Sequence, residues 1–474
     1  MVTYLPREEA DLVTYHLDRL SAYRSRNRVK NLYYEAKQKV DDLGTNLPAK
    51  YRAATLAVGF TGTAIDVLEE RLEFQGWMDE SGNDPYGLSD IFTENDLDIE
   101  ASAGHLDALI TGTGFAMVGA GAAGEPDALI TIESPDRVTG EWDRRLRRLS
   151  SALAVDEEDN GQASVITLFL PNEDITAHRR GGLWVEAERV VHGRNRVGVV
   201  QFQNRPRGSR WGGRSEITPA LRSYTDQAVE SLLGMKVHRS FYQAPQRYIL
   251  NASEGWFQNA DGSKVSGWET VSGRMMAVPA AEDPEDPEAK VGQFDPASPT
   301  PYIEMVRHYA ELVSAEAAIP LTYLGMSTAN PPSADAIRAL EARLIKKAER
   351  RQAAFGRAWR EVGALALMIR DGEIPEDYAT SVTTKWRDAA TPTRSAAADE
   401  VTKYVGAGVL PATSSITYDR MGLTPAEQRT LRSEKRREDA KARLDGLAQA
   451  ANAARQAAPG ATEEGEPTEP TDGS

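Results

Sequence analysis

A short polar loop between two strong helical patterns, within residues 315–359, constrains this chain more than any other feature. The helical spacing before the loop stops at Ile319-Pro320, because proline cannot continue a helix. After the loop, residues 334–369 contain no proline, and their spacing predicts one long helix. The loop is therefore held at both ends by helices while it has little apolar cover of its own.

A shared start signal predicts two more helices upstream. Thr218-Pro219 and Thr300-Pro301 each combine a capping hydroxyl with a proline at the first helical position. Apolar residues then repeat at helical spacing as far as residue 244 and residue 319. Residues 245–299, between these helices, have a strand-and-turn pattern. The sequence therefore predicts a compact β-rich insertion between two long helices.

The other regions complete an α+β fold that is mostly helical. Helical spacing covers residues 7–40, 50–72 and 90–111, and residues 393–457 are also predicted to be helical. Two strands joined by a glycine-rich turn are predicted over 112–135, and alternation over 150–200 predicts several more. The tail, residues 458–474, is acidic and proline-rich without large apolar residues, so we expect it to be disordered.

Composition limits the kind of protein this can be. The 474 residues are enough for roughly two to four domains, and 41% hydrophobic residues allow a sizeable core. The net charge of −16 is the opposite of that in proteins that coat DNA, so a DNA partner should pass without strong adhesion. No cysteine is present, which excludes disulfides and thiolate metal sites.

Membrane and export signals are also missing from the sequence. No apolar run approaches the ~18 residues of a membrane span. The N-terminus, MVTYLPREEADLV, has acidic residues where a signal peptide needs a basic start and an apolar core. We therefore expect no membrane partner and a chain that is soluble and intracellular when it is made.

Patterns that would indicate an enzyme are weak. Glycines at 112–114 and 119–121 follow a helical pattern and lead into a strand, the reverse of a dinucleotide-binding loop. Neither a GxxxxGK[ST] phosphate loop nor a GxSxG nucleophile elbow occurs. The six histidines form no pair at metal-ligand spacing. We therefore predict no catalytic residues, no metal and no cofactor.

One acidic cluster keeps an enzyme hypothesis open. Asp96, Asp98 and Glu100 lie near the start of a predicted helix. Carboxylates there interact favourably with the helix dipole, which is the interpretation we prefer. The alternative is a metal site, as a metal-dependent nucleic-acid enzyme would need.

The long helix is basic although the chain is acidic. Between residues 338 and 361 it holds eight basic and three acidic residues. These cations could pair with acids of neighbouring segments, hold acidic surfaces of neighbouring subunits, or bind DNA phosphates. The candidate residues are Arg338, Arg343, Lys346, Lys347, Arg350 and Arg351.

Two further groups are candidates for contacts with partners. The loop before the long helix is neither apolar nor charged, so it could pass close to a polyanion without binding it tightly; otherwise it is a surface connection. Its residues are Gly325, Met326, Ser327, Thr328, Ala329, Asn330, Pro331, Pro332 and Ser333. In the β-rich insertion, Trp256, Phe257 and Trp268 lie near glycine-rich turns. Such aromatic residues are either local core or anchors for a partner protein.

Several fragments resemble, in collinear order, the portal proteins of tailed double-stranded DNA phages, of the type with an SPP1-like portal. The opening segments RVKNLYY (28–34) and AVGFTGTAIDVLEERLEFQGW (57–77) are similar to the start of that family. So are ALITGTGFAMV (108–118) and GGRSEITPALRSYTDQAVESL (212–232). The strongest match is IPLTYLGMSTANPPSADAIRALEARLIKKAERRQ (319–352), which resembles a P…LG…NP.SA.AI…E..L pattern.

The resemblance implies a ring, usually of twelve subunits, at one capsid vertex of the virion. Double-stranded DNA would pass through the ring, driven by a separate terminase, during assembly in the host cytoplasm. Head-completion or adaptor proteins, the major capsid protein and the scaffold protein would be further partners. The implied regions are 1–215 (wing), 216–244 and 300–320 (stem helices), 245–299 (clip), 321–333 (tunnel loop), 334–392 (long wing helix and return) and 393–457 (crown).

Two other functions remain as alternatives to a DNA conduit. One is the metal-dependent nucleic-acid enzyme described above. The other is a phage adaptor or scaffold protein that binds partners through residues 245–298 without forming a ring. The number of subunits in the assembled state distinguishes the last from the first.

Overall fold

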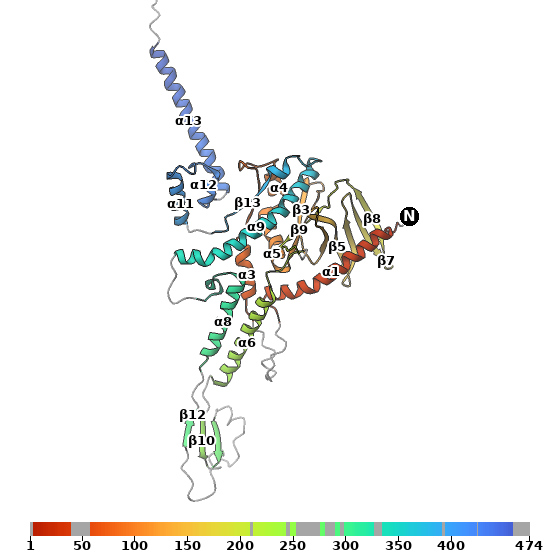
Figure 1. Cartoon of the computed structure of the whole chain (residues 1–474), viewed down its shortest axis with the longest axis vertical. Helices are drawn as coiled ribbons and strands as arrows, with labels where there is room; N and C mark the ends of the chain where they lie inside the picture. The colour runs from red at the N-terminus through yellow and green to blue at the C-terminus, as the bar shows by residue number, and fades with distance from the viewer. Residues whose placement is uncertain are drawn as a thin grey trace, which may run out of the picture. The chain divides into compact units, whose positions relative to one another are not determined.

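The computed structural model describes residues 3–38, 57–208, 212–242, 247–252, 275–279, 290–293, 298–326, 334–390, 394–423 and 425–457. The chain divides into two compact units, residues 1–390 and 391–474 (Figure 1). Within the described residues, no helix is both long and apolar enough to cross a membrane. The predicted tail at 458–474 lies outside the described residues.

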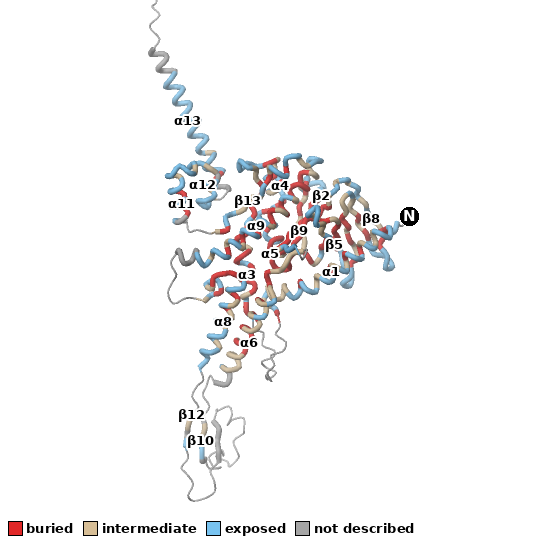
Figure 2. The backbone as a smooth tube through the Cα atoms, in the orientation of Figure 1, coloured by how far each residue is buried: buried red, intermediate tan, exposed pale blue. Residues whose placement is uncertain are grey.

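The main core of the first unit is built around α9 (Ala334–Arg370), the long helix predicted from the missing prolines. Its largest buried side chain, Trp359, stacks on Phe74 with ring centroids 4.5 Å apart. Trp77 donates a hydrogen bond of 2.9 Å to the carbonyl of Trp359. Figure 2 shows the buried residues gathered where α9, α5 and the small sheets meet. These contacts fix the long helix by its C-terminal half.

The described residues of the first unit form four sheets. A five-stranded antiparallel sheet has the order β4-β5-β6-β7-β8, and a three-stranded one has the order β3-β2-β9. The strands of these two are β2 (Thr113–Ala120), β3 (Ala128–Glu133), β4 (Val138–Asp143), β5 (Arg148–Asp159), β6 (Gln162–Phe169), β7 (Glu173–Arg180), β8 (Leu183–Val191) and β9 (Val199–Gln203). The third sheet pairs β1 (Phe74–Met78) with β13 (Thr383–Trp386), and Trp77 is opposite Thr384. The fourth sheet lies in the β-rich insertion.

Helices cover these sheets in two places. α1 (Arg7–Tyr34) lies along the five-stranded sheet, and its residues Val13 and Leu20 enter a core with Leu153 and Ile166 (Figure 1). The other helices that pack around the main core are short: α3 (Phe60–Glu69), α4 (Leu88–Glu94), α5 (Leu97–Thr111) and α10 (Tyr378–Ser381).

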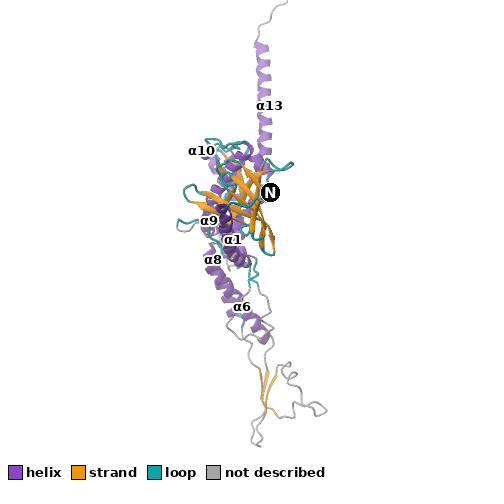
Figure 3. Cartoon of the chain, turned by 90° about the vertical axis from the view of Figure 1, so that its right-hand side faces the viewer, coloured by secondary structure: helices purple, strands orange, loops and turns teal. Residues whose placement is uncertain are grey.

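Two long helices, α6 (Pro219–Tyr242) and α8 (Thr300–Ala317), run side by side in both Figure 1 and Figure 3. Their close approach depends on Gly234, where an added Cβ would lie 2.8 Å from the ring of Tyr302. The insertion between them contains β10 (Arg247–Ala252), β11 (Met275–Pro279) and β12 (Lys290–Gln293). β10 pairs with β11 in parallel and with β12 antiparallel. The signal at Thr218 predicted the start of α6 correctly, and the Thr218 hydroxyl accepts a 3.2 Å hydrogen bond from the amide of Leu221. α8 starts one residue earlier than predicted, at Thr300 itself, with Pro299 at the N-cap and no side-chain cap.

The second unit is helical, as predicted. It consists of α11 (Arg394–Gly406), α12 (Ser415–Arg420) and α13 (Pro425–Ala457). The hydroxyl of Ser414 caps α12 by accepting a hydrogen bond from the amide of Ile416. Gln428 of α13 donates to the carboxylate of Asp419, 2.7 Å away, and so ties α13 to the end of α12.

Three expectations need correction. The helix predicted over 90–111 is two helices, because the chain turns at Asp96, which has φ +48°. The helix predicted over 7–40 ends at Tyr34. Of the helix predicted over 50–72, residues 60–69 are helical, and residues before 57 lie outside the described part. The sequence also gave no signal for the pairing of β1 with β13, whose partners are over 300 residues apart.

Candidate functional site

The loop singled out by the sequence starts from a fixed point. α8 ends at Ala317, and Ala318 takes a left-handed conformation with φ +62°. The hydroxyl of Ser314 then donates a 2.6 Å hydrogen bond to the carbonyl of Ile319. A 3-10 turn, η2 (Leu321–Leu324), follows, with Leu324 buried in the main core. Only Gly325 and Met326 of the predicted loop belong to the described part of the chain; residues 327–333 lie outside it.

Cations of α9 hold the end of α8. The guanidinium of Arg343 donates to the carbonyl of Ala315, and the ammonium of Lys347 donates to the carbonyl of Ala317, both at 3.0 Å. The last carbonyls of a helix have no partner within the helix and carry partial negative charge, so cations stabilise them. Part of the positive excess on α9 therefore interacts with a helix end.

A buried carboxylate, Glu216, links Lys347 and the nearby Arg351 to the start of α6. Its side chain is 4% exposed, and its oxygens lie 3.0 Å from the ammonium of Lys347 and 2.7 Å from the guanidinium of Arg351. Arg205 lies 3.6 Å away, and the amide of Asn204 donates a further hydrogen bond of 3.0 Å. Burial alone would raise the pKa of Glu216, but the attraction of Lys347 and Arg351 outweighs it and lowers the pKa to about 2. Glu216 is therefore ionised at neutral pH, and the cluster joins α6, α8 and α9.

A second ion pair lies close to the other end of the loop. Glu341, in the second turn of α9, accepts a 2.6 Å hydrogen bond from the hydroxyl of Tyr323 in η2. The same oxygen lies 3.2 Å from the guanidinium of Arg71, whose side chain is 5% exposed. Arg71 also donates to the carbonyl of Ala389, 2.6 Å away. The segments on both sides of the loop are thus tied to one arginine of the core.

Further cations of α9 line a groove beside this anchor. Its cavity volume is about 570 Å³, and its acidic lining residues are Glu216 and Glu316. Besides Lys347 and Arg351, its cationic residues are Arg205, Arg207, Arg214, Arg343, Lys346 and Arg350. Lys346 pairs with Glu349 at 2.7 Å on the exposed face. The side chain of Arg338 is outside the described part. A role for this groove towards a neighbouring subunit or DNA stays a prediction.

The structure offers little support for the enzyme hypothesis. Asp96, Asp98 and Glu100 lie at or in the first turn of α5, where carboxylates interact favourably with the helix dipole. Among the described residues, no three histidine, aspartate or glutamate side chains are placed to hold a metal ion. The aromatic residues Trp256, Phe257 and Trp268 lie outside the described residues, so their role stays a prediction.

Two histidines are buried in the core. His105 stacks on Phe355 at 5.0 Å and accepts a 2.9 Å hydrogen bond from the indole of Trp359. Burial lowers the pKa of His105 to about 3. His16 hydrogen-bonds to the hydroxyl of Ser151, and burial lowers its pKa to about 4. Both are neutral at pH 7 and have the environment of core residues.

Comparison with known proteins identifies the family. Residues 15–439 match the family described as "Phage portal protein, SPP1 Gp6-like". The chain belongs to this family of phage portal proteins. The portal protein of Mycobacterium phage D29 is 33% identical over 454 residues, which cover 91% of this chain and 90% of that protein. The portal protein of Mycobacterium phage L5 is 34% identical over 398 residues, covering 80% of this chain and 79% of that protein.

Solved structures show a more distant similarity. A chain in the neck of an empty gene transfer agent particle has a TM-score of 0.40 at 14% identity, covering 77% of this chain and 90% of that chain. A chain in the virion of a native gene transfer agent particle has a TM-score of 0.37 at 15% identity, with the same coverage.

Family membership favours one of the functions left open by the sequence. A portal protein is a structural head-to-tail connector of the virion and assembles as a homo-oligomeric ring at a capsid vertex. This favours the conduit over the enzyme and over an adaptor that forms no ring. Sequence reasoning missed Glu216, since a lone acid before a helix start is not a signal in itself, and it lies 135 residues from Arg351.

Proposed function

We propose that the loop of residues 325–333 faces the channel of the portal ring and contacts the double-stranded DNA that passes through it. The observation that carries this proposal is the anchoring of the loop. On one side, Lys347 and Arg343 hold the last carbonyls of α8, and on the other, Glu341 is tied to Tyr323 and Arg71. A loop that meets moving DNA needs fixed ends, because the load on it must be carried by the subunit.

The chemistry of the loop fits a sliding contact. Its sequence, GMSTANPPS, contains no charge, so it offers no cation for tight binding of phosphates. The chain around it has a net charge of −16. An acidic ring repels the DNA backbone and so favours passage over adhesion.

The partners of the ring follow from the same proposal. The sequence has no GxxxxGK[ST] phosphate-binding loop. This fits packaging by a motor in a separate protein, the terminase large subunit. During ejection, the ring would be a passive channel. The insertion 245–299 is proposed as the clip, with Trp256, Phe257 and Trp268 contacting terminase first and head-completion or adaptor proteins later. The wing and crown would contact the major capsid and scaffold proteins during assembly in the host cytoplasm. Twelve subunits are the proposed number.

Replacement of residues 327–332 by a three-residue glycine-serine linker tests the role of the loop. We expect the ring to assemble, as measured by native mass spectrometry, while the amount of nuclease-protected DNA per particle falls. A control variant keeps six residues in the loop but changes them all to glycine and serine, which separates loop length from loop chemistry. Normal packaging by the shortened variant, in rings that form normally, would remove the loop from the channel mechanism.

A further inference from the structure

A second basic cavity lies away from the channel loop, between α1 and the start of α6, and we name it the α1 pocket. Its volume is about 250 Å³. Five cationic side chains line it, and none of its lining residues is aspartate or glutamate. The five are Arg19, Arg26, Lys30, Arg214 and Arg222. Although the chain has 71 acidic and 55 basic residues, every charged residue that lines this cavity is a cation.

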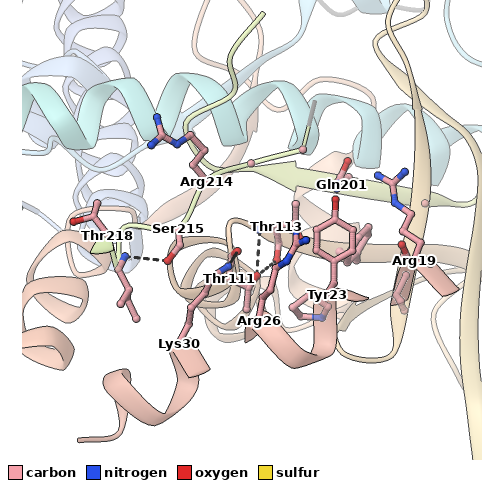
Figure 4. Close-up of a pocket in the computed structure, with 18 of the residues that line it drawn as sticks. Arg19, Tyr23, Arg26, Lys30, Thr111, Thr113, Gln201, Arg214, Ser215 and Thr218 are labelled. Atoms are coloured by element: carbon pink, nitrogen blue, oxygen red, sulfur yellow. Dashed lines mark hydrogen bonds between the residues drawn. The ribbon is translucent and has the colours of Figure 1, made fainter. Parts of the chain in front are cut away.

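Helix α1 presents these side chains as a stripe. Arg19, Tyr23, Arg26 and Lys30 follow the spacing i, i+4, i+7, i+11, which puts them on one face of a helix. Figure 4 shows all four along the same side of α1, with Arg214 on the loop before α6. The ring of Tyr23 lies between two guanidinium groups, 5.6 Å from Arg19 and 6.0 Å from Arg26. The tyrosine ring contacts both arginines but carries no negative charge, so the two positive charges are not neutralised.

In the part of the chain that the structure describes, most of these cations have no carboxylate partner. Within the described residues, no ion pair joins Arg19, Arg26, Arg214 or Arg222 to an acid, although Asp226 attracts Arg222 from one turn further along α6. The Nε atoms of Arg19 and Arg222 are also buried without a hydrogen-bond acceptor. A buried donor without an acceptor destabilises the fold. The described part of the chain therefore leaves the charge and some donors of these arginines unsatisfied.

We propose that the α1 pocket takes a carboxylate side chain from the neighbouring copy of this chain in the ring. Subunits in a closed ring of more than two meet through two different faces, so one face can be basic where the other is acidic. Copies with a net charge of −16 repel one another unless cations gather at the contact. Arginine pairs bind carboxylates through charge-assisted hydrogen bonds.

The size of the cavity favours a side chain over a nucleic acid. A volume of about 250 Å³ admits a glutamate or aspartate side chain. A DNA duplex, about 20 Å wide, contacts proteins with phosphates spread along a groove rather than with one inserted group. The inference rests on ring assembly by the portal family and does not depend on the proposed role of the channel loop.

The first test removes two charges from the pocket. In the full-length chain, Arg19→Gln with Arg26→Gln should raise the concentration at which half of the rings dissociate by roughly tenfold or more. The matched control, Arg7→Gln with Arg28→Gln, removes two charges from the same helix outside the pocket and should leave that concentration unchanged. Mass photometry measures the ring fraction, and circular dichroism checks that both variants fold.

The second test identifies the occupant in nearly wild-type rings. Rings assembled from equal amounts of ¹⁴N and ¹⁵N chains are treated with a carbodiimide, which joins a lysine to a carboxylate in direct contact. We expect cross-links of mixed isotope from Lys30, and from the amine introduced by Arg26→Lys, to an aspartate or glutamate of another copy. Cross-links within single copies alone, or none, would overturn the proposal. A second outcome would also overturn the proposal: the rings of the pocket variants are as stable as those of the control variant, but their affinity for duplex DNA is lower. The pocket would then be a phosphate-binding site.

Discussion

Replacing Glu216 by glutamine tests whether the buried cluster anchors the loop of residues 325–333. Glutamine has nearly the same shape as glutamate, and its side chain can still accept hydrogen bonds from Asn204 and Arg351. The substitution removes the charge and replaces the acceptor oxygen that faces Lys347 and Arg205 by an amide donor. Lys347 and Arg351, whose side chains are 17% and 10% exposed, are then left in the interior without their carboxylate.

The expected loss is large. Breaking a buried ion pair by removing one partner costs about 3–5 kcal/mol, because an uncompensated charge stays buried. The pKa of Glu216 indicates a free-energy loss of similar magnitude. A decrease of this pKa from 4.5 to about 2 corresponds to about 3 kcal/mol of stabilisation of the ionised form. We expect the free energy of unfolding of Glu216→Gln to be lower than that of the wild type by about this amount at pH 7.

Urea unfolding of the full chain, followed by far-ultraviolet circular dichroism, measures the effect. Glu311→Gln is the matched control, because Glu311 makes an exposed pair with Arg307 at 3.6 Å and should contribute less than about 1 kcal/mol. A double variant, Glu216→Gln with Lys347→Met, removes one of the two stranded cations. It should recover part of the loss, since an apolar side chain suits a buried position.

The pH dependence gives an independent check with a defined sign. The folded-state pKa of Glu216 is lower than its unfolded value, so its contribution is fully present above pH 4.5 and is lost as the pH falls towards 2. The difference between wild type and Glu216→Gln should therefore narrow across that interval. If Glu216→Gln unfolds within 1 kcal/mol of the wild type at pH 7, or if the difference does not change below pH 4.5, the anchoring argument is refuted.

Two further substitutions test the core of the first unit. His105 has a folded-state pKa of about 3, below its unfolded value of 6.5, so the stability it contributes above pH 6.5 should fall by about 2–3 kcal/mol between pH 7 and 4.5. Thermal melts of His105→Gln should lack this part of the acid dependence, whereas the exposed His308→Gln should keep it. Gly213→Ala would place a Cβ 1.6 Å from the carbonyl oxygen of Gly112, so its thermal midpoint should drop sharply, by about 3 kcal/mol or more in stability. Gly208→Ala, with open space around the added Cβ, is its control, and equal midpoints for the two alanine variants would contradict the packing described here.

Local signals predicted the long helices well. The threonine-proline pairs at 218 and 300 start α6 and α8, and the missing prolines mark the extent of α9. The break between α4 and α5 had no such signal. It depends on Asn95, a buried residue whose side chain bonds to the backbone of Ala128 and Ile130 in β3. Such a tertiary contact overrides helical spacing and cannot be read from the helix itself.

The candidate site was predictable in location but not in its contacts. The composition of α9 indicated an excess of cations, yet three explanations for it remained open. The carboxylate that pairs with Lys347 and Arg351 comes from a segment 131 and 135 residues earlier in the chain, and only the fold brings them together. The stripe of α1 was present in the sequence as Arg19, Tyr23, Arg26 and Lys30, but its meaning depends on the absence of acids across the cavity.

The two groups of cations differ in one respect that matters for assembly. Lys347 and Arg351 meet their carboxylate within the chain, so their cluster is complete in a single subunit and can position the loop before any ring forms. Arg19 and Arg26 have no such partner among the described residues, so in our proposal their contribution depends on a second copy. It follows that salt should act on the two differently: the buried cluster is weakly screened, whereas a contact between subunits weakens as ionic strength rises. Rings of this protein should therefore dissociate with added salt well before the subunit itself unfolds.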